Sequence, residues 1–343
     1  MKNKIIVTGG CGYIGSHTAI ELIQNHYDVV ILDDLSNSSE ETVHRIHKIT
    51  GVKPEFVKVD LKDPNQTKQV FKVHADAKAV IHFAAYKAVG ESVQEPLMYY
   101  HNNFYSLINT LISQRENGIK NFIFSSSATV YGTPDTLPIT ERNQTKRPFS
   151  PYGNTKKVSE EILDDLIKSD PEFNAISLRY FNPIGAHESG LIGELPSGIP
   201  NNLMPYITQT AAGIREKLMV FGNDYPTKDG TPIRDYIHVV DLAKAHVIAL
   251  ERLLSNQQET PFELFNLGTG VGYSVMDIIN TFETVTNTKL NYEITGRREG
   301  DVPALYASTD LARQKLKWKA EKDLNDMIRS AWEWEQNYRN RKV

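Results

Sequence analysis

Tyr152 and Lys156 are the residues of this chain whose types and spacing most directly suggest chemistry. Side chains four positions apart share one face of a helix, so the two groups meet if this segment is helical. A phenol titrates near ~10, and a fixed positive charge beside it lowers that pKa because it favours the phenolate. We therefore expect Lys156 to lower the pKa of Tyr152 enough for the phenol to accept a proton near neutral pH. The pair alone is a weak signal, since both residue types are common in solvated or packed positions.

A glycine-rich turn at 9–15 strengthens the case. It follows directly on an apolar segment at 4–8 and precedes a helical pattern. Gly9, Gly12 and Gly15 would let the chain turn tightly and bring backbone N–H groups close to a pyrophosphate, and the helix N-terminus adds partial positive charge. A strand, a glycine turn and a helix in this order predict a dinucleotide site.

Asp33 and Asp34 end the second expected strand and bear on which dinucleotide is bound. A carboxylate here accepts hydrogen bonds from the adenosine ribose hydroxyls and repels a 2′-phosphate. No arginine or lysine lies between residues 32 and 40 to offset that repulsion. We therefore expect NAD rather than NADP. Asp60, after the third strand, is placed either to meet the adenine edge or to cap a helix, and the sequence favours neither.

Other reactive side chains have simpler interpretations. Cys11 lies at a helix N-terminus, which lowers the pKa of a thiol, but no histidine or acid partner is near, so we interpret it as a small loop residue. His44 and His47 have metal-compatible spacing without a third ligand, and they fit a solvated helix face better. We expect no metal.

The composition is that of an ordinary folded protein. With 343 residues, 40% of them hydrophobic and 23% charged, the chain can form one large domain or two modest ones. A net charge of −4 gives no reason to expect nucleic acid or an anionic membrane surface as a partner. Cys11 is the single cysteine, which excludes a disulfide framework. No apolar run reaches the length of a signal peptide core or a membrane span, so we expect a cytoplasmic protein.

Strand-like and helix-like segments alternate through the first half of the chain. The expected strands are rich in Val, Ile and Phe, as buried parallel strands are, and cover 4–8, 28–32, 55–59, 79–83, 121–125 and 175–180. Helical patterns occupy 16–25, 102–117 and 152–169. This order predicts an α/β fold of Rossmann type, with a doubly wound parallel sheet, over residues 1–181. Prolines and glycines then mark irregular loops, so we expect 182–343 to form mostly a smaller C-terminal substrate-binding domain, with 235–253 returning to the first domain.

Several segments together resemble the extended short-chain dehydrogenase/reductases, and within them the UDP-glucose (UDP-galactose) 4-epimerases. The similarity runs from about residue 5 to residue 334, and the segments that carry it are 7–17, 87–93, 122–132, 179–187, 199–205, 221–226, 234–238 and 297–301. The resemblance implies NAD as cofactor, a UDP-sugar as substrate and a homodimer joined by the helices at 102–117 and 152–169. The amphipathicity of these helices is explained equally well by core packing.

The resemblance also implies a mechanism for the polar residues around Tyr152. Tyr152, as phenolate, takes the proton of the sugar 4′-hydroxyl while C4′ passes a hydride to NAD. Lys156 lowers the pKa of Tyr152 and holds the nicotinamide ribose, and Ser127 hydrogen-bonds the same 4′ oxygen. A 4-keto intermediate turns over and takes the hydride back on its other face, which regenerates NAD. The expected activity is thus reversible C4′ epimerisation of UDP-hexoses by an isomerase.

Two other activities are alternatives. A nucleotide-sugar 4,6-dehydratase shares the first step but needs a further acid/base, and its relatives carry Asp-Glu directly after the strand-end hydroxyl residue. Here these positions are Ala128 and Thr129, which leaves the elimination without a general acid. An NAD-binding regulator without catalysis would keep the glycine turn but need not keep Ser127, Tyr152 and Lys156 together.

The resemblance assigns further contacts. Cofactor contacts, besides the three glycines, Asp33, Tyr152 and Lys156, are expected at Tyr13, Ile14, Asp34, Leu35, Asn37, Ser38, Asp60, Leu61, Phe83, Ala84, Lys87, Asn102 and Phe181. Substrate contacts, besides Ser127 and Tyr152, are expected at Lys87, Asn182, Asn202, Leu203, Phe221, Arg234, Arg298, Asp301 and Leu305. Arginine suits a diphosphate because its permanent charge and planar fork make bidentate contacts.

Leu305 is where the chain departs from the family's pattern. The family's residue at this position borders the pocket near the sugar's C2 substituent, with Tyr associated with plain hexoses and a small Cys or Ser leaving room for an N-acetyl group. Leu is intermediate in bulk, although a one-residue slip would place the ring of Tyr306 there. We hypothesise that UDP-GlcNAc and UDP-GalNAc are accepted besides UDP-Glc and UDP-Gal; a preference for the acetylated pair is the alternative.

Overall fold

The computed structural model describes residues 2–298 and 301–340. The chain divides into two compact units. The first consists of Met1–Gly132, Gln144–Tyr180 and Ala243–Phe265, and the second of Thr133–Asn143, Phe181–Leu242 and Asn266–Val343. Among the described helices, none is both long and apolar enough to cross a membrane.

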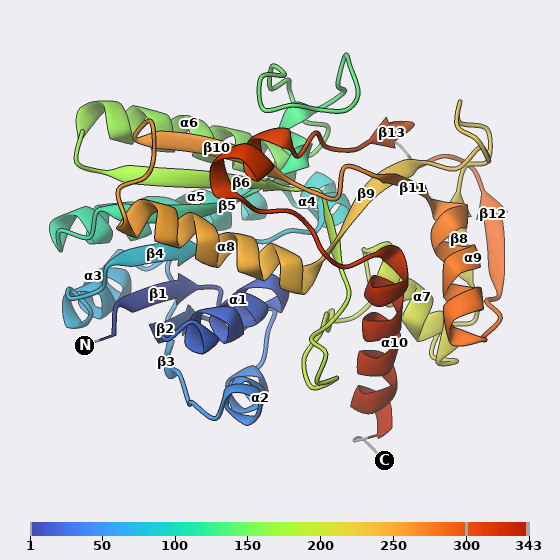
Figure 1. The fold of residues 1–343 in the computed structure, drawn as a ribbon, viewed down its shortest axis with the longest axis horizontal. Helices are drawn as coiled ribbons and strands as arrows, with labels where there is room; N and C mark the ends of the chain where they lie inside the picture. Colours follow the sequence, from blue (N-terminus) through green and yellow to red (C-terminus); the bar gives the residue numbers. More distant parts are fainter. Residues whose placement is uncertain (1, 299–300, 341–343) are drawn as a thin grey trace. The chain divides into compact units, whose positions relative to one another are not determined.

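The first unit is built on a seven-stranded sheet with the order β10-β6-β5-β4-β1-β2-β3 (Figure 1). The strands are β1 (Lys4–Thr8), β2 (Asp28–Asp33), β3 (Glu55–Lys58), β4 (Ala79–His82), β5 (Asn121–Ser127), β6 (Asn174–Tyr180) and β10 (Phe262–Leu267). The registered pairs from β3 to β6 are all parallel. The strand order reverses between β1 and β4, and ligands of such sheets bind beyond the carboxyl ends of the strands at this point. The predicted doubly wound α/β fold is confirmed.

Helices cover both faces of this sheet (Figure 1). One face carries α3 (Pro64–Val73), α5 (Pro96–Glu116) and α6 (Pro151–Ser169); the other carries α1 (Tyr13–Gln24) and α8 (Val239–Leu254). The helices α2 (Glu41–Thr50) and α4 (Val89–Gln94) also belong to this unit. The helical patterns predicted at 16–25, 102–117 and 152–169 correspond to α1, α5 and α6.

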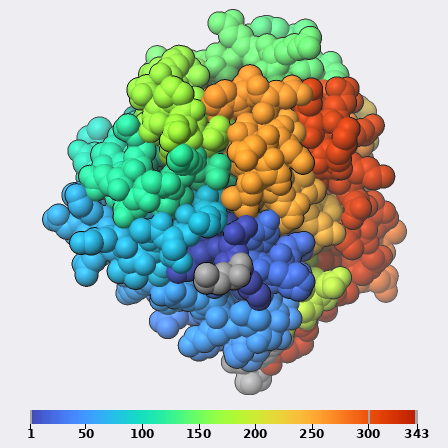
Figure 2. Space-filling model, turned by 60° about the vertical axis from the view of Figure 1, so that its left-hand side comes forward, coloured from blue at the N-terminus to red at the C-terminus, as the bar shows by residue number. Residues whose placement is uncertain are grey.

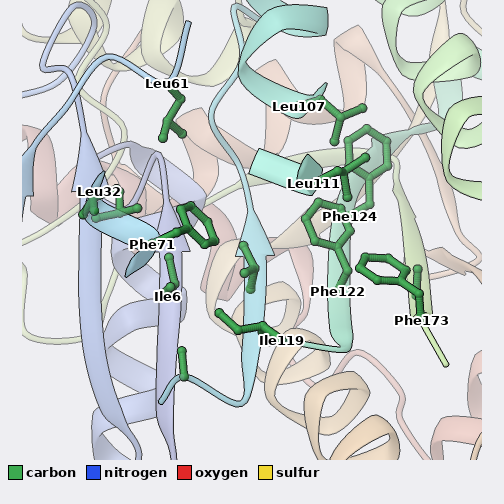
Figure 3. Close-up of a cluster of buried hydrophobic side chains, with 14 of the residues drawn as sticks. Ile6, Leu32, Leu61, Phe71, Leu107, Leu111, Ile119, Phe122, Phe124 and Phe173 are labelled. Carbon is green, nitrogen blue, oxygen red and sulfur yellow. The ribbon is translucent and has the colours of Figure 1, made fainter. Parts of the chain in front are cut away.

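A continuous apolar core holds α3, α5 and α6 against the sheet (Figure 3). Phe122 and Phe124 of β5 point to the same face because alternate residues of a strand do so, and they share this core with Ile6 of β1. Leu107 and Leu111 of α5 come from the helix side. Each such side chain contributes about 1.5–3 kcal/mol relative to an exposed position, so the site-bearing strand ends are anchored by the sheet beneath them.

The start of α6 is fixed by local sequence signals. Pro151 occupies its first turn, where a missing N–H costs nothing, and the Ser150 hydroxyl accepts a hydrogen bond from the N–H of Gly153. A Cβ on Gly153 would lie 2.7 Å from Cβ of Pro148, so glycine lets this turn approach the neighbouring chain. Tyr152 is thereby placed in the first turn of the helix.

The second unit contains two small sheets. In one, β9 (Ile233–His238) pairs in parallel with β7 (Asn182–Ile184) and β13 (Ala304–Leu305), and antiparallel with β11 (Gly272–Ser274). In the other, β8 (Leu218–Phe221) pairs in parallel with β12 (Tyr292–Thr295). The helices α7 (Leu203–Ala211), α9 (Val275–Thr286) and α10 (Leu324–Asn340) contribute to the core of this unit.

The segment that groups with the first unit differs from the range 235–253 expected from the sequence. β9 stays in the second unit because all three of its registered partners are there. The chain passes to the first unit within α8, and Ala243–Phe265 belongs to it.

Candidate active site

The glycine turn between β1 and α1 leaves no room for side chains. Gly9 has a φ of +65°, and a Cβ there would lie 2.7 Å from the backbone nitrogen of Ala84. A Cβ on Gly15 would lie 2.4 Å from the carbonyl oxygen of Gly9. Gly12 is the N-cap of α1 and provides no side-chain cap. The glycines thus let the turn close on itself and pack against the chain after β4, and the N-terminus of α1 that follows suits the pyrophosphate of a dinucleotide.

Asp33 braces this turn from the end of β2. Its Oδ2 accepts a hydrogen bond from the backbone N–H of Cys11 at 2.9 Å, and its Oδ1 accepts from the N–H of Leu35 at 2.9 Å and the hydroxyl of Ser38 at 2.8 Å. Burial raises the pKa of Asp33, and the three hydrogen bonds oppose this. Burial also raises the pKa of the Cys11 thiol, so the cysteine is a poor nucleophile.

Lys62 is a functional candidate that the sequence analysis missed. Its ammonium lies 3.0 Å from Oδ1 of Asp60 and 3.7 Å from Oδ2 of Asp34, and it donates to Oδ1 of Asn102 at 3.2 Å. Lys62 therefore contacts three residues that are predicted to bind the cofactor. No basic residue lies within 32–40, so the sequence around Asp34 did not indicate this cation. The helix-cap alternative for Asp60 is excluded, because Asp63 caps α3.

Asn103 is a second residue that sequence reasoning missed. Its side-chain amide donates to Oγ1 of Thr155 at 2.9 Å and to the carbonyl of Tyr86 at 3.1 Å, and its Oδ1 accepts from the N–H of Tyr86 at 2.8 Å. Oγ1 of Thr155 in turn donates to the carbonyl of Tyr152 at 2.7 Å. Asn103 thus fastens the loop after β4 to the first turn of α6. In the sequence, the feature that could have indicated this role is the presence of two adjacent asparagines, Asn102 and Asn103, within a helical pattern.

Tyr152 and Lys156 lie on α6 as their spacing predicts. Nζ of Lys156 is 6.0 Å from the centroid of the Tyr152 ring and 4.9 Å from that of Phe124. It donates a hydrogen bond to the carbonyl of Ser125 at 2.7 Å. Lys156 is buried, and Tyr152 is partly exposed. The phenol can therefore meet a ligand while the ammonium stays behind it.

Ser127 ends β5 and caps a short 3₁₀ helix, η1 (Ala128–Tyr131). Its Oγ accepts hydrogen bonds from the backbone N–H of Thr129 at 3.2 Å and from Oγ1 of Thr129 at 3.0 Å. Since both donors come from Thr129, the O–H of Ser127 is directed away from η1, and as a hydrogen-bond donor to Tyr152 it favours the phenolate. The structure therefore brings Ser127, Tyr152 and Lys156 together, and Thr129 orients the serine.

Desolvation, partial at Tyr152 and nearly complete at Lys156, shifts both titratable groups toward their neutral forms. It raises the pKa of Tyr152 to about 12, against the hydrogen bond from Ser127. It lowers the pKa of Lys156 to about 7, against the attraction of the Glu160 carboxylate. The expectation that Lys156 alone brings the pKa of Tyr152 near neutrality is therefore wrong for the protein by itself. A further positive charge next to the phenol would favour the phenolate.

The other predicted cofactor residues of the first unit follow its strands. Tyr13 and Ile14 begin α1, Leu35, Asn37 and Ser38 follow β2, Leu61 follows β3, and Phe83, Ala84 and Lys87 follow β4. Nζ of Lys87 lies 5.7 Å from the centroid of the Tyr13 ring. Phe181 belongs to the second unit, where its N–H donates to the carbonyl of Leu267 at 3.1 Å.

Two predicted arginines of the second unit each meet a predicted partner. Nη2 of Arg234 lies 2.8 Å from Oδ1 of Asp301. The guanidinium of Arg298 lies 4.6 Å over the ring of Phe221. Asp301 thus fixes one guanidinium, and an aromatic face supports the other. Residues 299 and 300 of the motif at 297–301 lie outside the described residues.

The remaining predicted substrate residues lie at the ends of elements in the second unit. Asn182 begins β7, and Leu203 begins α7. Asn202 is the N-cap of α7, and its side-chain amide donates to Oε1 of Glu194 at 2.8 Å. Within residues 2–298 and 301–340, no three His, Cys, Asp or Glu side chains are arranged to hold a metal ion.

Leu305 lies on β13 in register with Arg234 of β9. Directly paired residues of a parallel ladder point to the same face of the sheet, so these two side chains share one face. The ring of Tyr306 packs against Gly272, where a Cβ would lie 3.3 Å from it. Leu305, rather than Tyr306, therefore shares the side of the sheet that carries Arg234.

Comparison with known proteins agrees with this geometry. Residues 6–331 match the family model described as GDP-mannose 4,6 dehydratase. The UDP-glucose 4-epimerases of Drosophila melanogaster and Bacillus subtilis are 51% and 50% identical to the chain, and each match covers 96% of this chain and 96% of the relative. The chain belongs to the UDP-glucose 4-epimerase family.

Solved structures of this family are similar as well. The UDP-glucose 4-epimerase of Stenotrophomonas maltophila, with NAD and formylated UDP-arabinopyranose, has a TM-score of 0.95 and 46% identity over 100% of both chains. The enzyme of Bifidobacterium longum, with NAD+ and UDP, has a TM-score of 0.94 and 45% identity over 98% and 99% of the two chains. The UDP-Glc/GlcNAc 4-epimerase of Campylobacter jejuni has a TM-score of 0.84 and 36% identity over 98% and 99%.

Proposed function

We propose that this protein is an NAD-dependent isomerase that interconverts UDP-hexoses by inverting C4′. The observation that carries the proposal is the cluster of Ser127, Tyr152 and Lys156 in the same unit as a glycine turn that excludes side chains. Relatives about half identical over nearly the whole chain are named UDP-glucose 4-epimerases, which supports the same activity.

The first unit is the part of the chain suited to hold NAD. Gly9 and Gly15 let the turn close tightly before α1, whose N-terminus suits the pyrophosphate, and Asp33 is placed for the adenosine ribose. Lys156, behind the phenol, is suited to the nicotinamide ribose. When bound, oxidised NAD supplies the hydride acceptor for C4′ and a positive charge that favours the Tyr152 phenolate.

Proton transfer belongs to Tyr152 and its neighbours. The phenolate of Tyr152 takes the proton of the 4′-hydroxyl as C4′ is oxidised, and it returns the proton when the 4-keto sugar, having turned over, is reduced on its other face. Ser127, oriented by Thr129, hydrogen-bonds the same oxygen and can relay the proton. The ammonium of Lys156 stabilises the phenolate. A positioned acid–base group of this kind contributes typically about 10²- to 10⁴-fold in rate.

We assign the UDP moiety to the second unit. Arg234 and Arg298 match a diphosphate in charge and geometry, and Asp301 already holds Arg234 in place, so little side-chain entropy is lost on binding. Phe221 offers an aromatic face for the uracil. We place the sugar near Asn182, Asn202 and Leu203.

A nucleotide-sugar 4,6-dehydratase is the second candidate, because the family model that matches residues 6–331 carries that description. Elimination of water needs an acid/base besides Tyr152. Ala128 offers none, and the hydroxyl of Thr129 is used to orient Ser127. The residues after β5 therefore favour a reaction that stops at the ketone and reverses.

We also propose that the substrate range includes UDP-GlcNAc and UDP-GalNAc. Leu305 shares a sheet face with Arg234, while the ring of Tyr306 packs on Gly272. Leucine is smaller than tyrosine and leaves more room for an N-acetyl group at C2. A family member at 36% identity is named a UDP-Glc/GlcNAc 4-epimerase, so this breadth occurs among relatives.

Incubation of the purified protein with UDP-galactose, without added nicotinamide nucleotide, tests the proposed activity. We expect UDP-glucose to accumulate to a constant ratio, and the same ratio to be reached from UDP-glucose. A product that has lost water would support the dehydratase instead. The absence of any product, with NAD bound to the protein, would support a regulator without catalysis.

We propose that the protein is a homodimer joined through α5 and α6, which lie side by side at the surface (Figure 2, teal and light green). Tyr105, Ile108 and Ile112 recur on one face of α5 with exposed fractions of 53%, 40% and 51%. Apolar side chains repeated at this spacing indicate a helix face suited to a partner helix. A second copy of the chain supplies the same surface, as a two-fold interface requires.

Sedimentation equilibrium checks this assembly. The native protein is expected at about twice the 38.8 kDa of one chain, because two-fold dimers are the commonest assemblies. The double variant Ile108→Glu/Ile112→Glu is expected near the mass of one chain, since charged side chains would be desolvated at the interface. Val73→Glu, at an exposed position of α3, is the control and should stay dimeric. A native protein with the mass of one chain would contradict the proposal.

A further inference from the structure

Three consecutive serines of β5 each engage α6. The carbonyl of Ser125 accepts a hydrogen bond from Lys156, and the hydroxyl of Ser127, as a hydrogen-bond donor, acts to lower the pKa of Tyr152. Ser126 lies between them, and its hydroxyl donates to Oε1 of Glu160 at 2.6 Å. Tyr152, Lys156 and Glu160 are four residues apart on one helix face, so the catalytic pair and Glu160 form one row along α6. The proposed mechanism uses the first two members of this row and leaves Glu160 unexplained.

The carboxylate of Glu160 is buried and accepts four hydrogen bonds. Its Oε1 accepts from Ser126, from the hydroxyl of Ser177 at 2.8 Å and from Nε of Arg179 at 3.0 Å. Its Oε2 accepts from Nη2 of Arg179 at 2.6 Å. Glu160 and Arg179 have side-chain exposed fractions of 7% and 4%, so the ion pair is removed from water. The donors of these hydrogen bonds belong to β5, which carries Ser127, and to the neighbouring strand β6.

Arg179 extends the connection to the turn that orients Ser127. Its Nη1 donates to the hydroxyl of Tyr131 at 2.8 Å, and its guanidinium lies 4.8 Å over the Tyr131 ring. Tyr131 is the last residue of η1, whose first residues include Thr129. The carboxylate of Glu160 is therefore connected to β5 through Ser126, to β6 through Ser177 and Arg179, and to η1 through Arg179 and Tyr131.

A buried ion pair is a poor device for stability alone, because apolar side chains of the same volume often serve as well or better. The pair instead fixes the relative positions of the elements it joins, because bidentate, charge-assisted hydrogen bonds require a specific geometry. Here that geometry joins α6, which carries Tyr152 and Lys156, to the strand and turn that carry Ser127. A shift of α6 along β5 would misalign these hydrogen bonds, which weaken steeply away from their preferred distance and angle.

We propose that Glu160 is a positioning residue for the reaction at Tyr152: through Ser126, Ser177 and Arg179 it sets the placement of α6 on the sheet that aligns Tyr152 with Ser127 and Lys156 with Ser125. This inference rests on the proposed epimerase function and names a residue that touches neither substrate nor cofactor. Its action is through the two catalytic side chains on its own helix.

The charge of Glu160 supports the same role. The titratable and charged groups that face Lys156 are Tyr152 and Glu160 from α6 and His82 from β4. Burial and the neighbouring Lys156 lower the pKa of His82 to about 3, so this histidine is neutral. The Glu160 carboxylate opposes the effect of burial on the pKa of Lys156 and so favours the ammonium that the mechanism needs.

The test compares Glu160→Gln with Glu263→Gln. Glu263 makes a similar buried, bidentate pair with Arg252, at 2.7 and 2.9 Å, elsewhere in the first unit. Both variants remove one carboxylate from a buried arginine, so their losses of thermal stability should be similar. For Glu160→Gln we expect kcat for UDP-galactose to fall between ~10- and ~100-fold, the scale of a small misplacement of reacting groups, with KM and bound NAD unchanged. Glu263→Gln should keep the native kcat per folded molecule.

The dependence of kcat on pH separates positioning from a loss of folded protein. Without the carboxylate, the pKa of Lys156 falls further, so the ammonium is lost at lower pH. The alkaline limb of the profile should therefore move to lower pH by about half a unit or more in Glu160→Gln, and not at all in Glu263→Gln. If Glu160→Gln does not fold, the double variant Glu160→Gln/Arg179→Met, which removes both charges, should fold and show the lower kcat. Its alkaline limb should move less, because loss of the Arg179 charge opposes the effect of losing the carboxylate.

An unchanged kcat and an unchanged profile in either Glu160 variant would overturn the inference, whatever the stability. Equal changes in Glu160→Gln and Glu263→Gln would also overturn it. An inactive native protein would instead overturn the proposed function, so the two failures are distinguishable.

Discussion

Replacing Tyr152 with Phe is expected to lower kcat for UDP-galactose by about 10²- to 10⁴-fold, the range that general acid–base groups contribute. Phenylalanine keeps the ring and removes the phenol hydroxyl, so the 4′-hydroxyl of the sugar loses its proton acceptor. Lys156 remains bonded to the carbonyl of Ser125, and α6 keeps its cap, so fold and bound NAD should be unchanged. Initial rates, together with the NAD released on denaturation, measure both quantities.

Tyr292→Phe is the matched control for this substitution. Tyr292 loses the same hydroxyl at an exposed position of β12, and the variant should epimerise at the native rate. A Tyr152→Phe protein with a rate close to the native one would contradict the role of the phenol. A loss of bound NAD along with the rate would mean that the side chain acts in cofactor binding rather than in proton transfer.

Replacing Leu305 with Tyr is expected to lower kcat/KM for UDP-GlcNAc by about 10- to 200-fold relative to UDP-galactose, which is the scale of a steric mismatch of a few atoms in a pocket. The ring would extend from β13 on the face that carries Arg234, where the C2 substituent of the sugar is proposed to lie. A hydroxyl at C2 is smaller than an acetamido group, so UDP-galactose should be affected much less. Steady-state rates on the plain and the acetylated pairs measure this ratio.

Leu305→Met keeps the volume of the side chain and should leave the ratio of the two substrates unchanged. Equal losses on both pairs in Leu305→Tyr would mean that the residue supports the fold and does not select the substrate. A native protein that fails to turn over UDP-GlcNAc would rule out the broad substrate range directly.

Six of the seven strands in the sheet of the first unit could be predicted from sequence, because buried parallel strands are rich in Val, Ile and Phe, whereas β10 was not predicted. All six predicted segments correspond to β1 through β6, with ends shifted by at most two residues. The glycine turn was equally accessible, since no other residue tolerates the contacts at Gly9 and Gly15. The spacing of Tyr152 and Lys156 placed both on α6.

Residues that act through contacts distant in sequence could not be found this way. Lys62 reaches Asp34 from the segment after a different strand, and Asn103 joins α5 to Thr155, 52 positions away. The orientation of Ser127 by Thr129 depends on the turn geometry of η1. The spacing of residues in the sequence does not predict these contacts.

The protonation states of Tyr152 and Lys156 could not be predicted from the sequence either. Proximity of Lys156 predicted a lowered pKa for Tyr152, but burial acts on both groups and is the larger effect. Desolvation favours the neutral phenol and the neutral amine, and only a fold shows how much water reaches each.

The pairing of β9 within the second unit likewise depends on β7, β11 and β13, which are far from it in sequence.

The fate of the hydrogen on C4′ tests the central claim most directly. UDP-galactose carrying deuterium at C4′ is incubated with the protein in ordinary water, without added nicotinamide nucleotide, and the UDP-glucose formed is analysed by mass spectrometry and NMR. If the reaction is a reversible oxidation at C4′, the product keeps the deuterium at C4′, because the hydrogen leaves and returns as hydride within the site. Deuterium lost to solvent would mean that C4′ is deprotonated instead, and would contradict the mechanism.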